Sequence, residues 1–267
     1  MRRRALLMGG KSEPNTIIGG IGSVITTKSA LATKLGIPES IIRVFEIIGN
    51  DIHCHISQPY NLGGDDYRPF LNDLTVTSYI DLDGKCSALG NSCFNGATEL
   101  LEVYFPNAVN KGSGTYIFRY AEKLHTAYLP SLNSLANQCF EDNYALINLT
   151  VSSAKTITIS TFNRCTSIQF LDLPNVENCN NKDSTFRNLT SCQQISAKKL
   201  KVLGNPGQVG NPQNCFTGIR MDCLIQVHVD LASDNSGNAN AALQWAKDNR
   251  NATVEFYDDD GNYVSTL

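Results

Sequence analysis

The hydrophobic pattern in the middle of the chain repeats every 22 to 30 residues. Each copy begins with a phenylalanine, and these are Phe94, Phe118, Phe140, Phe162, Phe186 and Phe216. A period of this length is typical of a solenoid, in which each copy forms one turn that stacks on the next.

Three apolar columns follow the phenylalanine. Six residues after it stand Leu100, Leu124, Leu146, Ile168, Cys192 and, breaking the column, Asp222. Nine residues after it stand Val103, Ala127, Leu149, Leu171, Ile195 and Ile225, and eleven residues after it stand Phe105, Leu129, Val151, Leu173, Ala197 and Val227. Apolar residues two positions apart indicate a strand with one buried face, so each turn should add one short strand to a parallel sheet. A proline then ends the strand in three copies, at Pro106, Pro130 and Pro174.

The N-terminal part of the chain divides into two predicted segments. Residues 1–27 are rich in glycine and lack a sustained apolar period, which predicts an extended anchoring arm that a partner orders; the alternative is a plain disordered tail. Residues 28–78 predict a small β module and linker, with a short helix over 27–35 and a hairpin formed by 41–48 and 52–56.

The C-terminal part follows the same logic. The solenoid is expected over residues 79–232, and residues 233–267 should form its cap. Within the cap, apolar residues at helical spacing predict a helix over 238–249, and a turn between 253–257 and 263–266 predicts a hairpin. The same segment is alternatively an oligomer contact.

The repeated order of phenylalanine, small residue, leucine, two strand positions and Pro-Asn resembles the leucine-rich repeats of the bacterial surface-antigen (BspA-like) type over residues 80 to 230. This resemblance implies a mainly β fold, a leucine-rich-repeat solenoid with short parallel strands, and says little about function. The chain departs from the pattern at Tyr144, at Cys192 and in its stretched last copy.

Composition narrows the classes of partner. The net charge is −3 and only Met1–Arg4 is locally basic, which argues against a nucleic-acid surface. No apolar run is long enough for insertion into a membrane. The run Ala5–Met8 is too short for a secretory signal, so we expect synthesis and folding in a cytoplasm without export by a signal peptide. The nine cysteines are odd in number and fall mostly inside the repeat, which indicates buried free thiols.

His53-Cys54-His55 is the tightest cluster of potential metal ligands. Strand alternation should send both imidazoles to one face and Cys54 to the other. The pair resembles the His-x-His motif with which three chains of a phage fibre or spike enclose one metal ion; the alternative is two polar residues on the solvent side of a hairpin. No other cofactor is expected, and no nucleophile motif with a base indicates an enzyme.

The outward positions of the predicted strands, eight and ten residues after each phenylalanine, form the candidate binding face. They are Glu102, Tyr104, Thr126, Tyr128, Asn148, Thr150, Phe170 and Asp172, followed by Gln194 and Ser196. Tyr104 and Tyr128 should form an aromatic ladder beside Phe170, and such residues bind sugars or protein side chains. Scattered exposed aromatic residues are also ordinary on a protein surface.

The two ends of the chain, Met1–Gly10 and Val254–Ser265, resemble virion proteins of crAss-like tailed phages. This resemblance implies a non-enzymatic fibre or appendage subunit located in the virion. It implies contacts with other virion proteins through residues 1–27, assembly as a homo-oligomer such as a trimer, and binding to a host cell-surface glycan or protein. The alternatives are a bacterial cell-surface adhesin and an intracellular protein-binding scaffold. A polysaccharide hydrolase would need a closer carboxylate pair than Glu102 and Asp172, which should lie about 14 Å apart.

Overall fold

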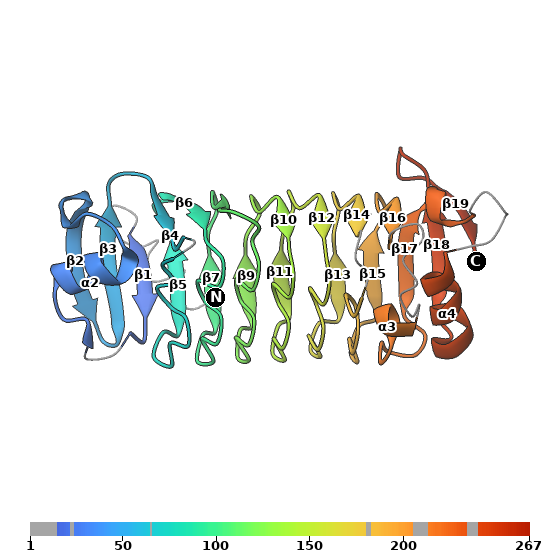
Figure 1. Ribbon diagram of the computed structural model, residues 1–267, viewed down its shortest axis with the longest axis horizontal. Coiled ribbons are helices and arrows are strands. Elements are labelled where there is room, and N and C mark those ends of the chain that lie inside the picture. The colour runs from blue at the N-terminus through green and yellow to red at the C-terminus, as the bar shows by residue number, and fades with distance from the viewer. Residues whose placement is uncertain (1–14, 22–23, 65, 180–182, 205–212, 234–239) are drawn as a thin grey trace.

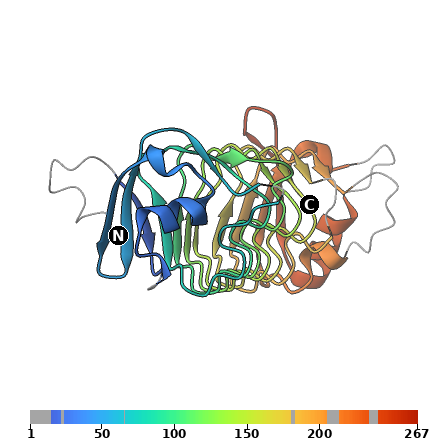
Figure 2. The same ribbon diagram turned by 60° about the vertical axis from the view of Figure 1, so that its left-hand side comes forward.

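The protein is an elongated β-solenoid, seen from the side in Figure 1 and obliquely in Figure 2. The computed structural model describes residues 15–21, 24–64, 66–179, 183–204, 213–233 and 240–267. The predicted mainly β solenoid with short parallel strands is confirmed.

Each turn contributes one strand to what we call the front of the solenoid. The front strands are β5 (Ser78–Asp81), β7 (Glu102–Tyr104), β9 (Thr126–Tyr128), β11 (Asn148–Thr150), β13 (Phe170–Asp172), β15 (Gln194–Ala197) and β17 (Leu224–His228). Neighbouring turns pair in parallel and in register, so Val103 stands opposite Ala127 and Ala127 opposite Leu149. The columns predicted nine and eleven residues after each phenylalanine therefore face the core.

A second, shorter strand in most turns lies on the back of the solenoid, and the sequence did not predict it. The back strands are β4 (Tyr60–Leu62), β6 (Cys86–Leu89), β8 (Val109–Asn110), β10 (Ser134–Leu135), β12 (Thr156–Ile157), β14 (Asn178–Cys179) and β16 (Val202–Leu203). They pair in parallel in the orders β4-β6-β8 and β10-β12-β14-β16. The front ladder is interrupted between β11 and β13, and the back ladder between β8 and β10.

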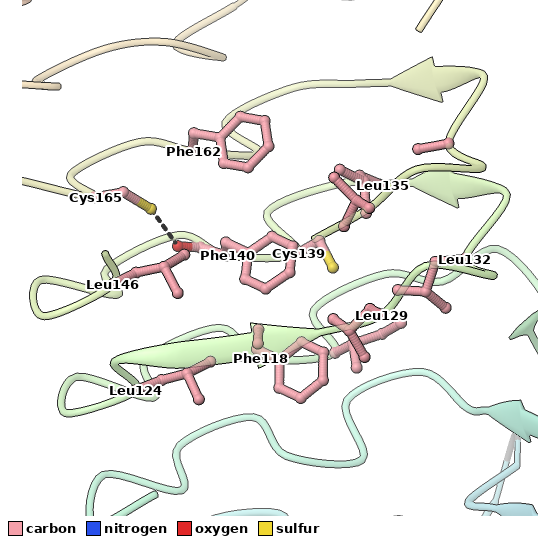
Figure 3. Packing of buried hydrophobic residues seen from close by; sticks show 14 of the residues in the cluster. Phe118, Leu124, Leu129, Leu132, Leu135, Cys139, Phe140, Leu146, Phe162 and Cys165 are labelled. Carbon is pink, nitrogen blue, oxygen red and sulfur yellow. Dashed lines mark hydrogen bonds between the residues drawn. The ribbon is translucent and has the colours of Figure 1, made fainter. Parts of the chain in front are cut away.

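The repeat phenylalanines stack in one column through the core, part of which is shown in Figure 3. From Phe94 to Phe216, successive ring centroids lie 5.4 to 6.2 Å apart with nearly parallel planes. Cys165 Sγ, in a small core position, donates to the carbonyl of Phe140 at 3.0 Å. All nine cysteines are buried and free, as predicted, and burial raises the pKa of Cys139 to about 12.

The solenoid starts one turn earlier than the sequence suggested. Phe70 stacks on Phe94 at 4.9 Å, so residues predicted to be linker form a full turn that ends in β5. This turn escaped prediction because its eleventh position is Asp81, a carboxylate, where the other copies are apolar. Asp81 is fully buried and accepts hydrogen bonds from Thr16 Oγ1 and from the backbone N–H groups of Lys85 and Cys86, which allows a polar residue in that column.

Charged side chains connect adjacent turns beside the phenylalanine column. Arg119 Nε donates to Glu141 Oε2 at 2.8 Å, and Arg164 Nη2 donates to Asp142 Oδ2 at 2.6 Å. The carboxylate side chains of Glu141 and Asp142 are only 6% and 1% exposed. Their burial is tolerated because each has a guanidinium partner from a neighbouring turn.

The N-terminal body extends the front sheet beyond β5. Its elements are β1 (Thr16–Gly19), α2 (Lys28–Leu35), the short 3-10 helix η2 (Glu39–Ile41), β2 (Ile42–Ile48) and β3 (Asp51–Ile56). The helix and the β2–β3 hairpin agree with the predicted module. The arm predicted over 1–27 does not extend that far: β1 lies between β3 and β5 and pairs antiparallel with both, because Ile18 belongs to the core. Residues 1–14 lie outside the described residues, so the arm stays a prediction there.

The C-terminal end closes the core with a helix and a hairpin. After α3 (Gln213–Phe216) and the 3-10 helix η3 (Val229–Leu231), α4 (Ala241–Arg250) buries Leu243 against the last turn. Strand β18 (Thr253–Tyr257) pairs in parallel with β17, and β19 (Tyr263–Thr266) pairs antiparallel with β18. The predicted helix and hairpin are thus present, and no helix of the described segments is long and apolar enough to cross a membrane.

Candidate binding face

The predicted binding residues lie on the outer face of the front strands in two rows. Glu102, Thr126 and Asn148 are aligned in one row, and Tyr104, Tyr128 and Thr150 in the other. Phe170 and Asp172 lie on β13, beyond the interruption of the front ladder. The structure therefore brings six of the eight predicted residues into one sheet and places the other two in the next.

Tyr104 and Tyr128 form the expected aromatic ladder. Their ring centroids are 4.7 Å apart and their planes differ by 9°. Phe170 does not lie beside them: its register partner is Gln194, and the whole of strand β11 separates it from Tyr128. The reason is the position within the repeat, because Phe170 stands eight residues after its phenylalanine and the tyrosines stand ten residues after theirs.

An open groove of about 880 Å³ lies beside the row that begins with Glu102. Its lining residues are Leu101, Glu102, Lys123, His125, Thr126, Ala145 and Asn148. On its floor Thr126 Oγ1 lies 3.0 Å from His125 Nδ1 and accepts from Asn148 Nδ2 at 3.3 Å. The groove spans three turns, which suits an elongated ligand that runs across the strands.

Aliphatic side chains flank this groove, and the sequence did not single them out. Leu101 lines the groove and is 47% exposed, and Ile147, which directly precedes the lining residue Asn148, is 42% exposed. Leu101, His125 and Ile147 all stand seven residues after a repeat phenylalanine. That position precedes the strand and is outside its alternation of buried and exposed residues. Aligning the copies at position seven would have revealed these residues.

The carboxylates of the face are too far apart for paired acid–base chemistry. Glu102 on β7 and Asp172 on β13 are separated by β9 and β11, which at normal strand spacing corresponds to about 14 Å. Paired glycosidase carboxylates are about 5 to 9.5 Å apart. Lys123, the cation of the groove, is paired with Glu99 at 2.7 Å.

A polar network closes the C-terminal end of the face. Gln194 donates to Gln226 Oε1 at 3.0 Å, and Gln226 Nε2 donates to Glu255 Oε2 at 2.9 Å and to Tyr257 Oη at 2.8 Å. Tyr257 in turn donates to Glu255. Burial and this hydrogen bond to Glu255 raise the pKa of Tyr257 to about 12.

The predicted histidine pair lies on the outer face of β3, with Cys54 in the core between them, as alternation required. His53 is in register with Ile17 of β1, which is in register with Ile80 of β5 and so with Tyr104. Ile17 and Ile80, which stand between His53 and Tyr104 in this row, are almost fully buried. His53 and the tyrosine ladder are therefore aligned but do not belong to one continuous exposed surface.

His55 has a partner that the sequence did not indicate. Its Nδ1 lies 3.1 Å from both carboxylate oxygens of Asp83, which also accepts from the backbone N–H of Ile56. Burial raises the pKa of Asp83. Within the described ranges, no three His, Cys, Asp or Glu side chains converge in a group that could hold a metal ion. A metal at His53 and His55 would therefore need ligands beyond those that the described residues bring together.

One comparison with known proteins identifies the repeat. Residues 68–147 match the family model described as BspA type leucine rich repeat region (6 copies). The chain contains a leucine-rich repeat region of the BspA type. The matched leucine-rich repeats begin before Phe70, in agreement with the additional first turn, and the stacked phenylalanines continue the same architecture as far as Phe216. Neither the curated proteins nor the solved structures contain a match to the chain.

Proposed function

We propose that this protein is a non-enzymatic binding protein that holds a protein partner across the outer face of its front strands. Leucine-rich-repeat solenoids typically bind rather than catalyse, and fold alone does not select the ligand. The observation that favours a protein partner is the pair of exposed aliphatic side chains at Leu101, which lines the groove, and Ile147, which directly precedes the lining residue Asn148. Apolar anchors in a polar rim are what protein interfaces use.

A glycan is the less favoured ligand. Sugars stack on open aromatic faces, and Tyr104 and Tyr128 use one face each on one another, 4.7 Å apart. Leu101 and Ile147 offer no planar surface and no hydrogen bond to a hydroxyl group. The aliphatic flank of the groove is thus better matched to apolar side chains of a polypeptide.

The test uses a random peptide display library and a glycan array, each probed with the full chain. The binding variant carries Leu101→Lys and Ile147→Lys, and the matched control carries Val109→Lys, at a residue 40% exposed on back strand β8. We expect the wild type and the control to enrich peptides with apolar residues and the binding variant to lose that enrichment. Failure to enrich any peptide, or glycan binding that depends on Tyr128, would refute a protein partner.

The setting that we propose is the virion of a tailed phage, with the solenoid facing a host surface protein and residues 1–14, the part of the predicted arm that precedes β1, contacting other virion proteins. The support is the resemblance of the two ends of the chain to virion proteins of crAss-like phages; the comparisons add nothing to it. The threefold metal site that this resemblance implies at His53 and His55 belongs to the virion proposal and is the alternative to the twofold dimer proposed below. Mass spectrometry of purified particles tests it, and absence of the protein from particles would rule it out.

A further inference from the structure

Strand β2 is the outermost strand at the N-terminal end of the front sheet. The sheet order is β11-β9-β7-β5-β1-β3-β2, and in the described part of the chain no strand pairs with the far edge of β2. Three of its apolar side chains are exposed: Val44 at 36%, Ile47 at 49% and Ile48 at 57%. An open edge strand with exposed apolar side chains is a template for pairing with another strand.

We propose that β2 pairs with β2 of a second copy of this chain, antiparallel about a twofold axis at Glu46. A twofold axis perpendicular to a sheet places an edge strand antiparallel to itself, so one open edge is sufficient for a closed dimer. The front sheet would then run continuously through both molecules. This arrangement is a dimer and not the trimer that the phage resemblance implied.

The register follows from the side chains. Val44 is opposite His55, and Phe45 and Ile47 are opposite the core residues Cys54 and Ile52, so from Val44 onward odd-numbered residues face the core side and even-numbered residues face outward. Only residues on the same face can stand opposite one another. With Glu46 on the axis, Phe45 stands opposite Ile47 and Val44 opposite Ile48, each pair twice.

Shifting the axis loses these contacts. With Phe45 on the axis, Glu46 would stand opposite Val44; with Ile47 on the axis, it would stand opposite Ile48. In both alternatives each copy places its Glu46 carboxylate against an apolar side chain of the other copy. The one apolar pair that remains is the residue on the axis facing its own counterpart. The Glu46 register is therefore the one that pairs all of the exposed apolar residues of β2.

The cost of this register is a like-charge pair. The two Glu46 side chains meet at the axis, and like charges directly opposite one another weaken strand pairing. His53 is the register neighbour of Glu46 on β3 and lies on the same face. With Glu46 on the axis, removal of its charge should therefore strengthen the dimer.

Sedimentation velocity of the full chain over a concentration series tests the dimer. A single strand pair buries less than the roughly 1,000 Å² of a stable interface, so the series should extend to about 500 μM. We expect Ile48→Lys to raise the dimer Kd at least tenfold and Glu46→Gln to lower it several-fold. Val264→Lys, at a residue 48% exposed on β19 at the other end of the solenoid, should leave the Kd unchanged. A wild type and a Glu46→Gln variant that both stay monomeric, or a dimer lost with Val264→Lys and kept with Ile48→Lys, would overturn the proposal.

Cross-linking tests the register. Residues directly opposite across an antiparallel pair have Cβ atoms about 4.5 to 5.5 Å apart, close to the geometry of a disulfide. Glu46→Cys should therefore give a covalent dimer on oxidation by dissolved oxygen, and Val44→Cys should not, because Val44 faces Ile48 in the other copy. The nine native thiols are buried and add little background. Cross-linking by Val44→Cys, or none by Glu46→Cys, would contradict the Glu46 axis.

Discussion

Replacing Phe140 by alanine removes a middle ring from the phenylalanine column, and we expect the free energy of unfolding to fall by about 4 kcal/mol. Phe140 is fully buried, and its ring lies 5.4 Å from that of Phe118 and 5.9 Å from that of Phe162. Truncation of a buried phenylalanine costs about 3 to 5 kcal/mol, and this range includes the transfer of the ring and the cavity that it leaves.

The upper half of that range applies because the site cannot easily collapse. The backbone N–H of Phe140 donates to the carbonyl of Thr161 at 3.0 Å, and that of Phe118 donates to Cys139 at 2.9 Å. These bonds fix the spacing of the turns, so the neighbouring rings cannot move together to fill the cavity. With a total stability of about 5 to 15 kcal/mol for a typical domain, the loss is a large fraction of the whole.

Urea unfolding followed by circular dichroism measures the effect. Phe140→Leu keeps most of the volume and should cost about 1.5 kcal/mol or less. The surface control Phe170→Ala, at a residue 62% exposed, should change stability by no more than about 0.5 kcal/mol. A loss below about 1.5 kcal/mol for Phe140→Ala, or equal losses for Phe140→Ala and Phe170→Ala, would refute the view that the stacked column stabilises the solenoid.

Three further predictions concern polar and thiol groups. Arg164→Ala leaves the Asp142 carboxylate, 1% exposed, without its guanidinium and should cost about 2 kcal/mol in the same urea assay, whereas Arg164→Lys should recover part of this loss. The hydrogen bonds from Gln226 lower the pKa of Glu255, so their stabilisation is present above the ordinary glutamate pKa and is lost as the pH falls through the lowered value. The stability difference between wild type and Glu255→Gln should therefore shrink between pH 6 and pH 3, and a constant difference would contradict this. Because burial raises the pKa of Cys139 to about 12, this thiol should resist iodoacetamide at pH 8 in the native protein and react in urea; rapid labelling of native Cys139 would disagree.

The sequence was sufficient to predict the columns because a stacked core requires the same kind of side chain at the same place in every turn. The prediction failed in the first turn, where a buried carboxylate, Asp81, replaces the apolar residue of the column and is stabilised by hydrogen bonds. The back strands were missed for another reason: at two residues each in most turns, as in β12 and β14, they are too short to show an alternation.

The candidate face was predicted to a similar extent. Strand alternation located Tyr104 and Tyr128, and their stacking followed from register. Leu101 and Ile147 were missed because they stand at position seven of the repeat, before the strand and outside its alternation of buried and exposed residues. The pairing of His55 with Asp83 connects residues from two elements and has no local signature.

The two interruptions in the strand ladders have a mechanical consequence, because they occur at different junctions. Where the front ladder stops between β11 and β13, the back strands β12 and β14 remain paired; where the back ladder stops before β10, the front strands β7 and β9 remain paired. In the described part of the chain the two interruptions therefore do not coincide, and at each of them the ladder on the opposite side continues to hold the neighbouring turns together. Under tension along its long axis, the solenoid should therefore unfold from its ends before its middle turns separate.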